Sequence, residues 1–322
     1  MRKALVVGIN DYPTCPLTGC VNDAELMKAL LSHHENGDPN FQVMVRTDLK
    51  TRGELKQLIE NCFSGHADTA LFYFSGHGHV DSIGGYLVTP DFSAHDYGIS
   101  LQDLLSIANR SECKEKIIIL DCCYSGMMGS ISTVGQNTTV IGLGVTIMTA
   151  SREDEAAKET GEHGLFTSLL AEALGGGAAD VTGKISIGSI YAFIDKALGP
   201  WDQRPMFKTN VSRFTSIRDV KPRVPLDVIR KLGDYFSEPT ARFRLDPSYE
   251  PTNSVSVQHE VREPYAVNEH TEIFACLQQM ARIGLVEPVG AEHMYFAAIE
   301  SKSCALTAVG RHYWNLIKND LL

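Results

Sequence analysis

Two apolar segments of the chain each end in a polar turn whose residues could carry out acyl transfer. Residues 69–74 are followed by Ser-Gly-His-Gly, which places a histidine at position 77. Residues 116–120 are followed by Asp-Cys-Cys-Tyr-Ser-Gly, which brings Cys122 and Cys123 to the end of that segment. A thiolate can attack a carbonyl carbon, and an imidazole can give the leaving amine its proton. If His77 and one of these cysteines meet in space, the pair predicts a Cys–His hydrolase.

The apolar composition of the two segments indicates how the histidine and a cysteine could come together. Both are continuously apolar and rich in β-branched or aromatic residues, which is typical of strands buried on both faces. Strands of this kind belong to parallel sheets that helices cover on both sides. In those sheets the functional residues gather at the carboxyl ends of the strands. We therefore expect His77 and a cysteine of the second turn at one edge of one sheet.

Residues 1–219 alternate predicted strands with predicted helices. Strands are expected at residues 3–10, 41–47, 69–75, 115–121, 144–150 and 205–210. Helices are expected at residues 20–33, 52–62, 100–108, 164–174 and 187–198. This alternation predicts an α/β domain with a mostly parallel sheet flanked by helices. Residues 127–143, which are rich in Gly, Ser and Thr, are expected to form a flexible loop.

A change of composition at residues 220–225, Val-Lys-Pro-Arg-Val-Pro, predicts a linker, because proline disfavours regular structure. The chain is therefore expected to have two domains, residues 1–219 and residues 220–322. In the second, helices are expected at 226–235, 272–283 and 307–317, strands at 285–288 and 304–306, and an extended segment at 294–300. This order resembles a winged-helix module. The domain is nearly neutral and lacks the basic stripe that phosphate binding needs, which favours an interaction or sensing role over DNA binding.

Composition excludes several classes of protein. No apolar run approaches the roughly 20 residues that span a bilayer. The first apolar run is too short for a signal peptide and is read as a strand. The eight cysteines show no Cys-x-x-Cys spacing, which disfavours zinc knuckles and disulfide frameworks and favours reduced thiols in the cytoplasm.

The formal net charge of −10 is unevenly distributed. Residues 220–322 carry 11 basic and 13 acidic side chains, so the remaining 18 basic and 26 acidic residues give residues 1–219 a charge of about −8. An acidic first domain disfavours nucleic acid as a substrate and favours cationic ligands. An equally good explanation of this charge is an acidic surface that only keeps the protein in solution.

The two turns resemble the catalytic signatures of caspase-like cysteine peptidases in the metacaspase or orthocaspase branch, which is bacterial in type. Cys123 follows His77 by 46 residues, close to the separation of about 50 in caspases. The resemblance covers about residues 3–212. Four further segments support it, at residues 8–10 (Gly-Ile-Asn), 17–24 (Leu-Thr-Gly-Cys-Val-Asn-Asp-Ala), 149–151 (Thr-Ala-Ser) and 164–167 (Gly-Leu-Phe-Thr). It implies a caspase-like fold and endopeptidase activity.

The resemblance implies a role for each residue of the two turns. The family places its nucleophile two residues after the aspartate, which selects Cys123 and leaves Cys122 as a small buried residue. His77 would protonate the leaving amine and activate water. The backbone N–H groups of Gly78 and Cys123 would bind the oxyanion. His33, His34, His66 and His79 are expected at the surface or at helix ends.

Substrate specificity is also implied by the resemblance. Asp23 and Asp121 match the two aspartates that line the metacaspase pocket for the residue before the cut, so substrates with Arg or Lys there are expected. The alternative for Asp23 is an acid that stabilises a helix N-terminus. The chain departs from the family at Tyr124, where histidine is common; this position lies outside the catalytic pair, and the departure predicts a different local pocket shape.

No cofactor is required by the sequence, and the metal question stays open. Many metacaspases need Ca²⁺, which an acidic cluster binds. The candidate acids do not follow a recognisable calcium spacing: Asp91, Asp96, Glu153, Asp154 and Glu155.

The second domain resembles modules fused to caspase-like effectors of bacterial antiviral defence, which a nucleotide-type ligand or an upstream partner switches on. Six side chains could meet an anionic ligand there: Arg242, Arg244, Arg282, His293, Tyr295 and Arg311. Each has the simpler interpretation of a surface or capping residue. The alternative function is a catalytically silent caspase-fold scaffold whose second domain binds a partner or DNA. The presence of both His77 and Cys123 favours the enzyme.

Overall fold

The structure is a computed structural model that describes residues 1–122, 141–150, 159–160, 163–198, 205–254 and 261–322, the side chains of 159–160 excepted. Cys123, Tyr124 and most of the predicted loop 127–143 therefore lie outside the described residues. The chain forms two compact units, Met1–Lys221 and Pro222–Leu322. Each unit is described by itself.

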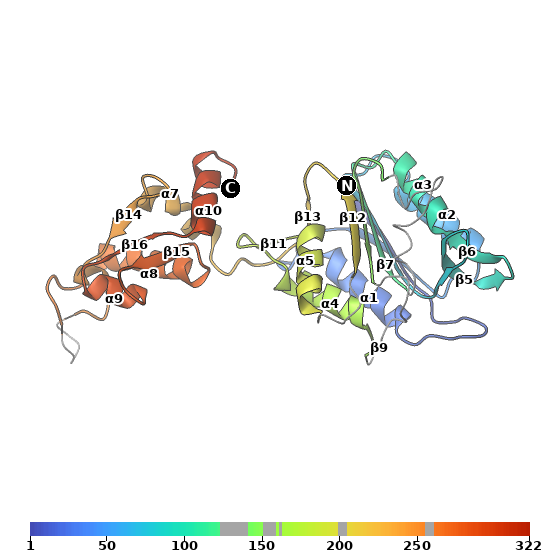
Figure 1. Cartoon of the computed structure of the whole chain (residues 1–322), viewed down its shortest axis with the longest axis horizontal. Coiled ribbons are helices and arrows are strands. Elements are labelled where there is room, and N and C mark those ends of the chain that lie inside the picture. The colour runs from blue at the N-terminus through green and yellow to red at the C-terminus, as the bar shows by residue number, and fades with distance from the viewer. Residues whose placement is uncertain (123–140, 151–158, 161–162, 199–204, 255–260) are drawn as a thin grey trace. The chain divides into compact units, whose positions relative to one another are not determined.

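The first unit is built on a six-stranded sheet with the order β12-β8-β7-β3-β1-β2 (Figure 1). Its strands are β1 (Arg2–Gly8), β2 (Gln42–Thr47), β3 (Thr69–Ser75), β7 (Glu115–Asp121), β8 (Val145–Thr149) and β12 (Met206–Asn210). Neighbours pair in parallel except β12, which is antiparallel to β8. The expected mostly parallel sheet is confirmed. Every predicted strand of this sheet ends within two residues of its observed bounds.

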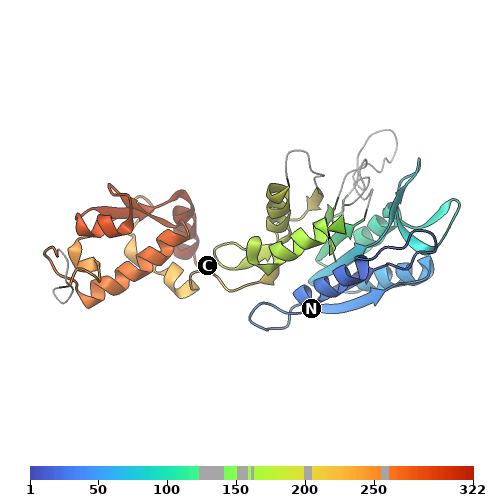
Figure 2. The same ribbon diagram turned by 90° about the horizontal axis from the view of Figure 1, so that it is seen from below.

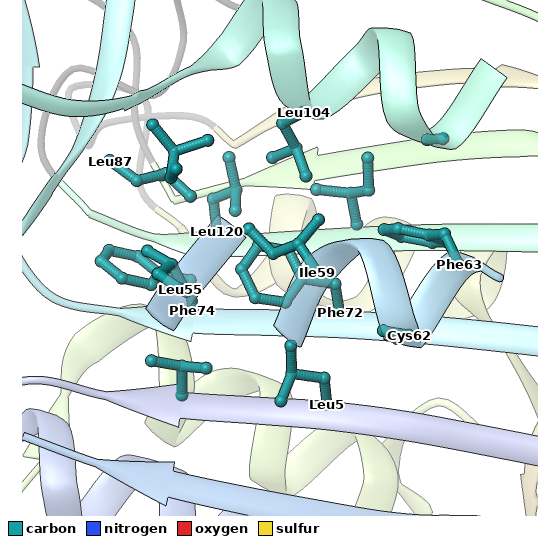
Figure 3. Packing of buried hydrophobic residues seen from close by; sticks show 14 of the residues in the cluster. Leu5, Leu55, Ile59, Cys62, Phe63, Phe72, Phe74, Leu87, Leu104 and Leu120 are labelled. Carbon is teal, nitrogen blue, oxygen red and sulfur yellow. The ribbon is translucent and has the colours of Figure 1, made fainter. Parts of the chain in front are cut away.

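Helices cover both faces of this sheet (Figures 1 and 2). One face packs against α1 (Cys20–Ser32), α4 (Leu165–Glu172) and α5 (Ile187–Ala197). The other packs against α2 (Arg52–Phe63) and α3 (Leu101–Arg110). Figure 3 shows Phe72 and Phe74 of β3 packed with Leu55 and Ile59 of α2 and with Leu104 of α3. The continuous apolar character of β3 arises because both of its faces are covered in this way.

Polar side chains at the helix starts explain where these helices begin. Thr51 and Glu54 form a capping box at α2, and the Ser100 hydroxyl accepts from the N–H of Asp103 at α3. Helix α1 lacks a side-chain cap at Gly19, and the Asn10 side chain accepts from the backbone N–H of Cys20 instead, at 2.9 Å. The end of β1 and the start of α1 are thereby joined.

Short antiparallel sheets complete the first unit. β4 (Gly78–Val80), β5 (Gly85–Ser93) and β6 (Asp96–Ser100) form a three-stranded sheet that begins directly after His77. Leu87, Val88 and Ile99 of this sheet belong to the core beneath α2 and α3. Two further pairs are β9 (Glu159–Thr160) with β10 (His163–Gly164) and β11 (Lys184–Ser186) with β13 (Ser216–Asp219). A π-helical turn, Ala173–Gly177, follows α4.

The second unit combines helices with a three-stranded antiparallel sheet of order β14-β16-β15. The strands are β14 (Arg242–Arg244), β15 (Val286–Val289) and β16 (Ser303–Leu306). The helices are α6 (Leu226–Arg230), α7 (Leu232–Tyr235), α8 (Asn268–Arg282), α9 (Met294–Ile299) and α10 (Ala308–Lys318), with a 3₁₀ turn at Pro247–Tyr249. In the part of the chain that the structure describes, no helix is long and apolar enough to cross a membrane.

The prediction for residues 294–300 was wrong, because this segment is the helix α9 and not an extended chain. Its run Met-Tyr-Phe-Ala-Ala-Ile is short and apolar, and a run of this length cannot be assigned to helix or strand by periodicity. The helix buries Met294, Ala297 and Ala298, at the spacing of one helical face, and leaves Tyr295 and Phe296 exposed. Strand β14 was not predicted. It is only three residues long and has two exposed arginines.

Candidate active site

The pairing of β3 with β7 places the two candidate turns, which follow Ser75 and Asp121, side by side. The strands run parallel, with Ser75 opposite Asp121, and the N–H of Gly76 donates to the Asp121 carbonyl at 3.3 Å. His77 stands two residues beyond Ser75, and position 123 is two residues beyond Asp121. His77 and the start of the Cys123 turn therefore leave the same edge of the sheet on neighbouring strands. Cys122 is buried, as expected.

The imidazole of His77 is oriented by a backbone carbonyl. Its Nε2 lies 2.7 Å from the carbonyl oxygen of Cys15. A carbonyl oxygen can only accept, so Nε2 carries the proton and Nδ1 is left as the basic nitrogen of the neutral ring. The ring of Tyr12 packs edge-on against His77, with centroids 4.6 Å apart. This arrangement leaves Nδ1 as the atom that can take a proton from a thiol.

The backbone of His77 is held by the hydroxyl of Tyr12. This hydroxyl accepts from the N–H of His77 at 3.1 Å and donates to the carbonyl of Val88 at 3.2 Å. Burial raises the pKa of Tyr12, so the phenol keeps the proton that it donates. Position 76 must be glycine, because a Cβ there would lie 2.6 Å from the Tyr12 hydroxyl. Gly78, the predicted oxyanion donor, is the first residue of β4, and its predicted partner Cys123 lies outside the described residues.

Asp23 is one of two buried carboxylates near this edge. The residue is 2 % exposed, and its Oδ2 accepts from the Ser75 hydroxyl at 2.9 Å. Its Oδ1 lies 2.9 Å from Nδ1 of His163. Burial raises the pKa of Asp23, although hydrogen bonds from His163, Ser75 and the backbone of Gly164 oppose that effect. The carboxylate thus faces the end of β3 and strand β10.

Asp121 is the second buried carboxylate. Its Oδ2 accepts from the hydroxyl of Thr167 at 2.6 Å, and that hydroxyl accepts from Tyr73 at 2.5 Å. A Cβ at Gly164 would lie 3.0 Å from Oδ2 of Asp121 and 3.7 Å from Oδ2 of Asp23. Both carboxylates therefore converge on the backbone of Gly164. The structure brings together the two aspartates that the resemblance selected.

Several residues of this site were not identified from the sequence. Tyr12, Cys15 and His163 act through a hydroxyl, a carbonyl or an imidazole, and each lies in a segment without distinctive spacing. Ser75 belongs to the Ser-Gly-His-Gly turn, but its hydrogen bond to Asp23 was not predicted. Residues 164–167 were noted in the sequence only because they match the family, without a physical role. Their physical role is the space that Gly164 leaves and the hydroxyl that Thr167 provides.

The described acidic residues do not fit a calcium site. Both carboxylate oxygens of Asp91 accept from the backbone N–H of Arg52, and Asp96 forms an ion pair with the Arg52 guanidinium at 2.8 Å. Glu153, Asp154 and Glu155 lie outside the described residues. Within the described ranges, no group of three or more His, Cys, Asp or Glu side chains could hold a metal ion.

Three of the six residues predicted for an anionic ligand lie around one hollow of the second unit. Arg282, His293 and Tyr295 line this hollow, whose volume is about 660 Å³, together with Glu287 and Glu292. The lining is thus of mixed charge. The other three are placed differently: Arg242 and Arg244 lie on β14, and Arg311 donates to the carbonyl of Leu306 at 3.0 Å.

Comparison with known protein families identifies the first unit. A family model described as the caspase domain matches residues 1–215. The crystal structure of a protein from Geobacter sulfurreducens is similar to this chain at 16 % identity, with a TM-score of 0.49, and the match covers 68 % of this chain and 99 % of that one. A comparison with curated proteins gave no match.

Proposed function

Because the chain belongs to the caspase-domain family of cysteine peptidases, we propose that it is an endopeptidase that cuts after Arg or Lys by means of Cys123 and His77. The observation that supports this most is the convergence of Asp23 and Asp121 beside the edge where the His77 and Cys123 turns leave adjacent strands. A histidine with a fixed tautomer supplies the base, and two buried acids favour a cationic side chain.

The proposed reaction begins with proton transfer from the Cys123 thiol to Nδ1 of His77. The thiolate attacks the scissile carbonyl, and the backbone N–H groups of Gly78 and Cys123 stabilise the resulting oxyanion. Collapse of this intermediate breaks the C–N bond while the imidazolium gives its proton to the leaving amine. Water, deprotonated by His77, then hydrolyses the thioester and releases the acid. The Cys15 carbonyl contributes by accepting from Nε2 in each step, so the imidazolium is stabilised where it forms.

The proposed specificity rests on charge and on hydrogen-bond geometry. Asp23 and Asp121 would pair with the guanidinium or ammonium of the residue before the cut. A guanidinium presents several N–H donors in one plane and can reach two carboxylates at once, which suits two acids that converge on one glycine. An aspartate before the cut would place a third negative charge there and is therefore disfavoured.

A panel of fluorogenic peptides tests this function. Peptides that differ only in the residue before the reporter group, Arg, Lys or Asp, would be given to the full chain and to Cys123→Ala. We expect cleavage of the Arg and Lys peptides by the wild type and none by the variant. Preference for the Asp peptide would overturn the specificity. Equal rates for wild type and variant would favour the catalytically silent scaffold instead.

The proposal extends to regulation by the second unit, residues 222–322 as the structure divides the chain. We propose that this unit is a winged-helix-like sensor for a nucleotide-type ligand or an upstream partner. Its separate core and the hollow beside Arg282, His293 and Tyr295 support this role. An effector of bacterial antiviral defence or cell death, of the metacaspase branch, would need such control, because an unregulated Arg/Lys peptidase endangers its own cell.

We expect activation to leave the chain uncut through residues 117–151. No Lys or Arg occurs between Lys116 and Arg152, so a peptidase with the proposed specificity cannot process the loop 127–143 by itself. Control would then come from a ligand or partner that binds the active state more tightly. Intact-mass measurement after activation checks this. Fragments split within residues 127–143 that appear with activity, and are absent in Cys123→Ala, would contradict it.

A further inference from the structure

Three aromatic side chains form a cluster on the small sheet that begins directly after His77. The rings of His79 and Tyr97 lie with their centroids 3.9 Å apart, and those of Tyr86 and Tyr97 lie 5.4 Å apart. All three residues are partly exposed. The mechanism described above uses none of them.

The cluster shares a sheet face with the catalytic histidine. The carbonyl of His77 accepts from the N–H of Val88 at 2.9 Å, which continues the ladder in which Gly78 pairs with Leu87 and His79 pairs with Tyr86. Residues two apart on a strand point to the same face, as do residues directly opposite each other. His77, His79 and Tyr86 therefore lie on one face. His79 is separated from His77 by about 7 Å along the strand.

The two carboxylates lie on the other side of His77. Asp23 belongs to α1, and Thr167, the partner of Asp121, belongs to α4; both helices pack in the core on one face of the main sheet. Leu87, Val88 and Ile99 of the small sheet pack in the core on the opposite face. A substrate with its basic side chain at Asp23 and Asp121, and its scissile bond at His77, would therefore extend its leaving segment over β4.

We propose that His79, Tyr86 and Tyr97 form a subsite for an aromatic side chain of the leaving segment, at about the second residue after the cut. This inference rests on the proposed peptidase function. An extended peptide advances about 3.3 Å per residue, so its second residue beyond the scissile bond lies at the level of His79. Aromatic rings packed edge-to-face or offset attract one another beyond their area of contact.

The turn of the hairpin that carries His79 and Tyr86 is fixed by hydrogen bonds, which favours a preformed subsite. Asp81 accepts from the N–H groups of Ile83 and Gly84 at 2.8 and 3.0 Å and so fixes the turn between β4 and β5. Burial and the neighbouring Asp81 carboxylate raise the pKa of Tyr86, so its hydroxyl stays protonated beside that acid. The subsite would thus bind the aromatic side chain of the substrate without a prior rearrangement of its own strands.

The test compares two internally quenched peptides on one enzyme. The peptides are identical up to and including the Arg before the cut, and carry Phe or Ala as the second residue after it. We expect the wild type to prefer Phe about two- to tenfold in kcat/KM. Tyr97→Ala should bring the ratio to about one, and Tyr97→Phe should keep it, because the ring is retained. The ratio is measured on each variant by itself, so a general loss of activity cancels.

A matched control and two outcomes make the test decisive. Phe92, an exposed aromatic residue of the same strand β5 outside the cluster, serves as the control, and Phe92→Ala should keep the wild-type ratio. A wild-type ratio of one, or a Phe preference that survives Tyr97→Ala, would overturn the subsite while leaving the peptidase proposal intact. Cleavage of neither peptide, nor of a fluorogenic Arg amide, would overturn the peptidase proposal and the subsite with it.

Discussion

Replacement of His77 by alanine is expected to lower kcat/KM for an Arg peptide by about 10⁴-fold. In the proposed mechanism the imidazole takes the thiol proton, protonates the leaving amine and activates water, so its loss would affect every chemical step. The side chain is partly exposed, and its backbone contacts to Tyr12 and Val88 do not depend on the ring. The melting temperature should therefore stay close to that of the wild type, as calorimetry can verify.

His66→Ala is the matched control for this substitution. His66 is 83 % exposed and pairs only with Glu112 at the surface among its described contacts, so its loss should leave cleavage unchanged. The double variant His77→Ala/Cys123→Ala should be no slower than either single variant, because the two groups act as a unit. Losses that multiply in the double variant would show that His77 and Cys123 act independently and would contradict the dyad.

Replacement of Asp23 by asparagine is expected to lower kcat/KM for an Arg peptide by about a hundredfold. The substitution keeps the shape of the side chain and can keep hydrogen bonds to Ser75 and His163. It removes the charge that would pair with a guanidinium, and a charge-assisted bond is roughly twice as strong as a neutral one. Steady-state kinetics on Arg and Asp peptides measure the effect. Cleavage should not move to the Asp peptide, because Asp121 remains.

The stability of Asp23→Asn should not fall at neutral pH. Burial raises the pKa of Asp23, so the folded state holds a proton more tightly than the unfolded state does. For such an acid the unfolding free energy decreases as pH rises from about 4 through the raised folded pKa. Asparagine does not ionise, so the unfolding free energy of the variant does not decrease in this way. The melting temperature of the variant relative to the wild type should therefore rise over that interval of pH.

Asp68→Asn is a control for which the expected effect on stability has the opposite sign. Hydrogen bonds from Lys114 and the N-terminal ammonium lower the pKa of Asp68 to about 2. Its carboxylate therefore stabilises the fold above the unfolded pKa, and this contribution is lost as pH falls through the folded value. Asp68→Asn should reduce stability slightly at neutral pH and leave cleavage unchanged.

Full activity of Asp23→Asn on Arg peptides would contradict the proposed pocket and would identify Asp23 as a structural acid.

The strands that carry the site could be predicted because burial on both faces leaves a strong pattern. β3 and β7 were predicted residue for residue, since continuous apolar runs stop abruptly at glycine-flanked turns. The pairing of Ser75 with Asp121 could not be predicted, because register depends on neighbours rather than on local sequence. α9 was misassigned for a related reason, since six apolar residues contain less than two helical turns of periodicity.

The site itself was predictable only where side-chain chemistry is distinctive. His77 stands in a recognisable turn, whereas Asp23 was selected by resemblance and not by spacing. Nothing in the sequence indicates that His163 would lie 2.9 Å from Asp23, or that Thr167 would bond Asp121, because these contacts join α1 and β7 to segments about 140 and 46 residues later in the chain. Such contacts depend on the packing of whole elements, which local patterns do not contain.

The hydrogen bond between His77 and the Cys15 carbonyl has a consequence for how the sequence around the proposed active site could diverge. A carbonyl belongs to the main chain, so every amino acid at position 15 presents the same acceptor, and a scan of substitutions would find that position permissive. The position of the carbonyl that orients His77 therefore depends on the conformation of the loop after β1 and not on the residue type at position 15. Homologues could keep this part of the proposed active site while sharing no residue there. A shift of that loop could remove the orienting hydrogen bond without any change in the proposed catalytic residues.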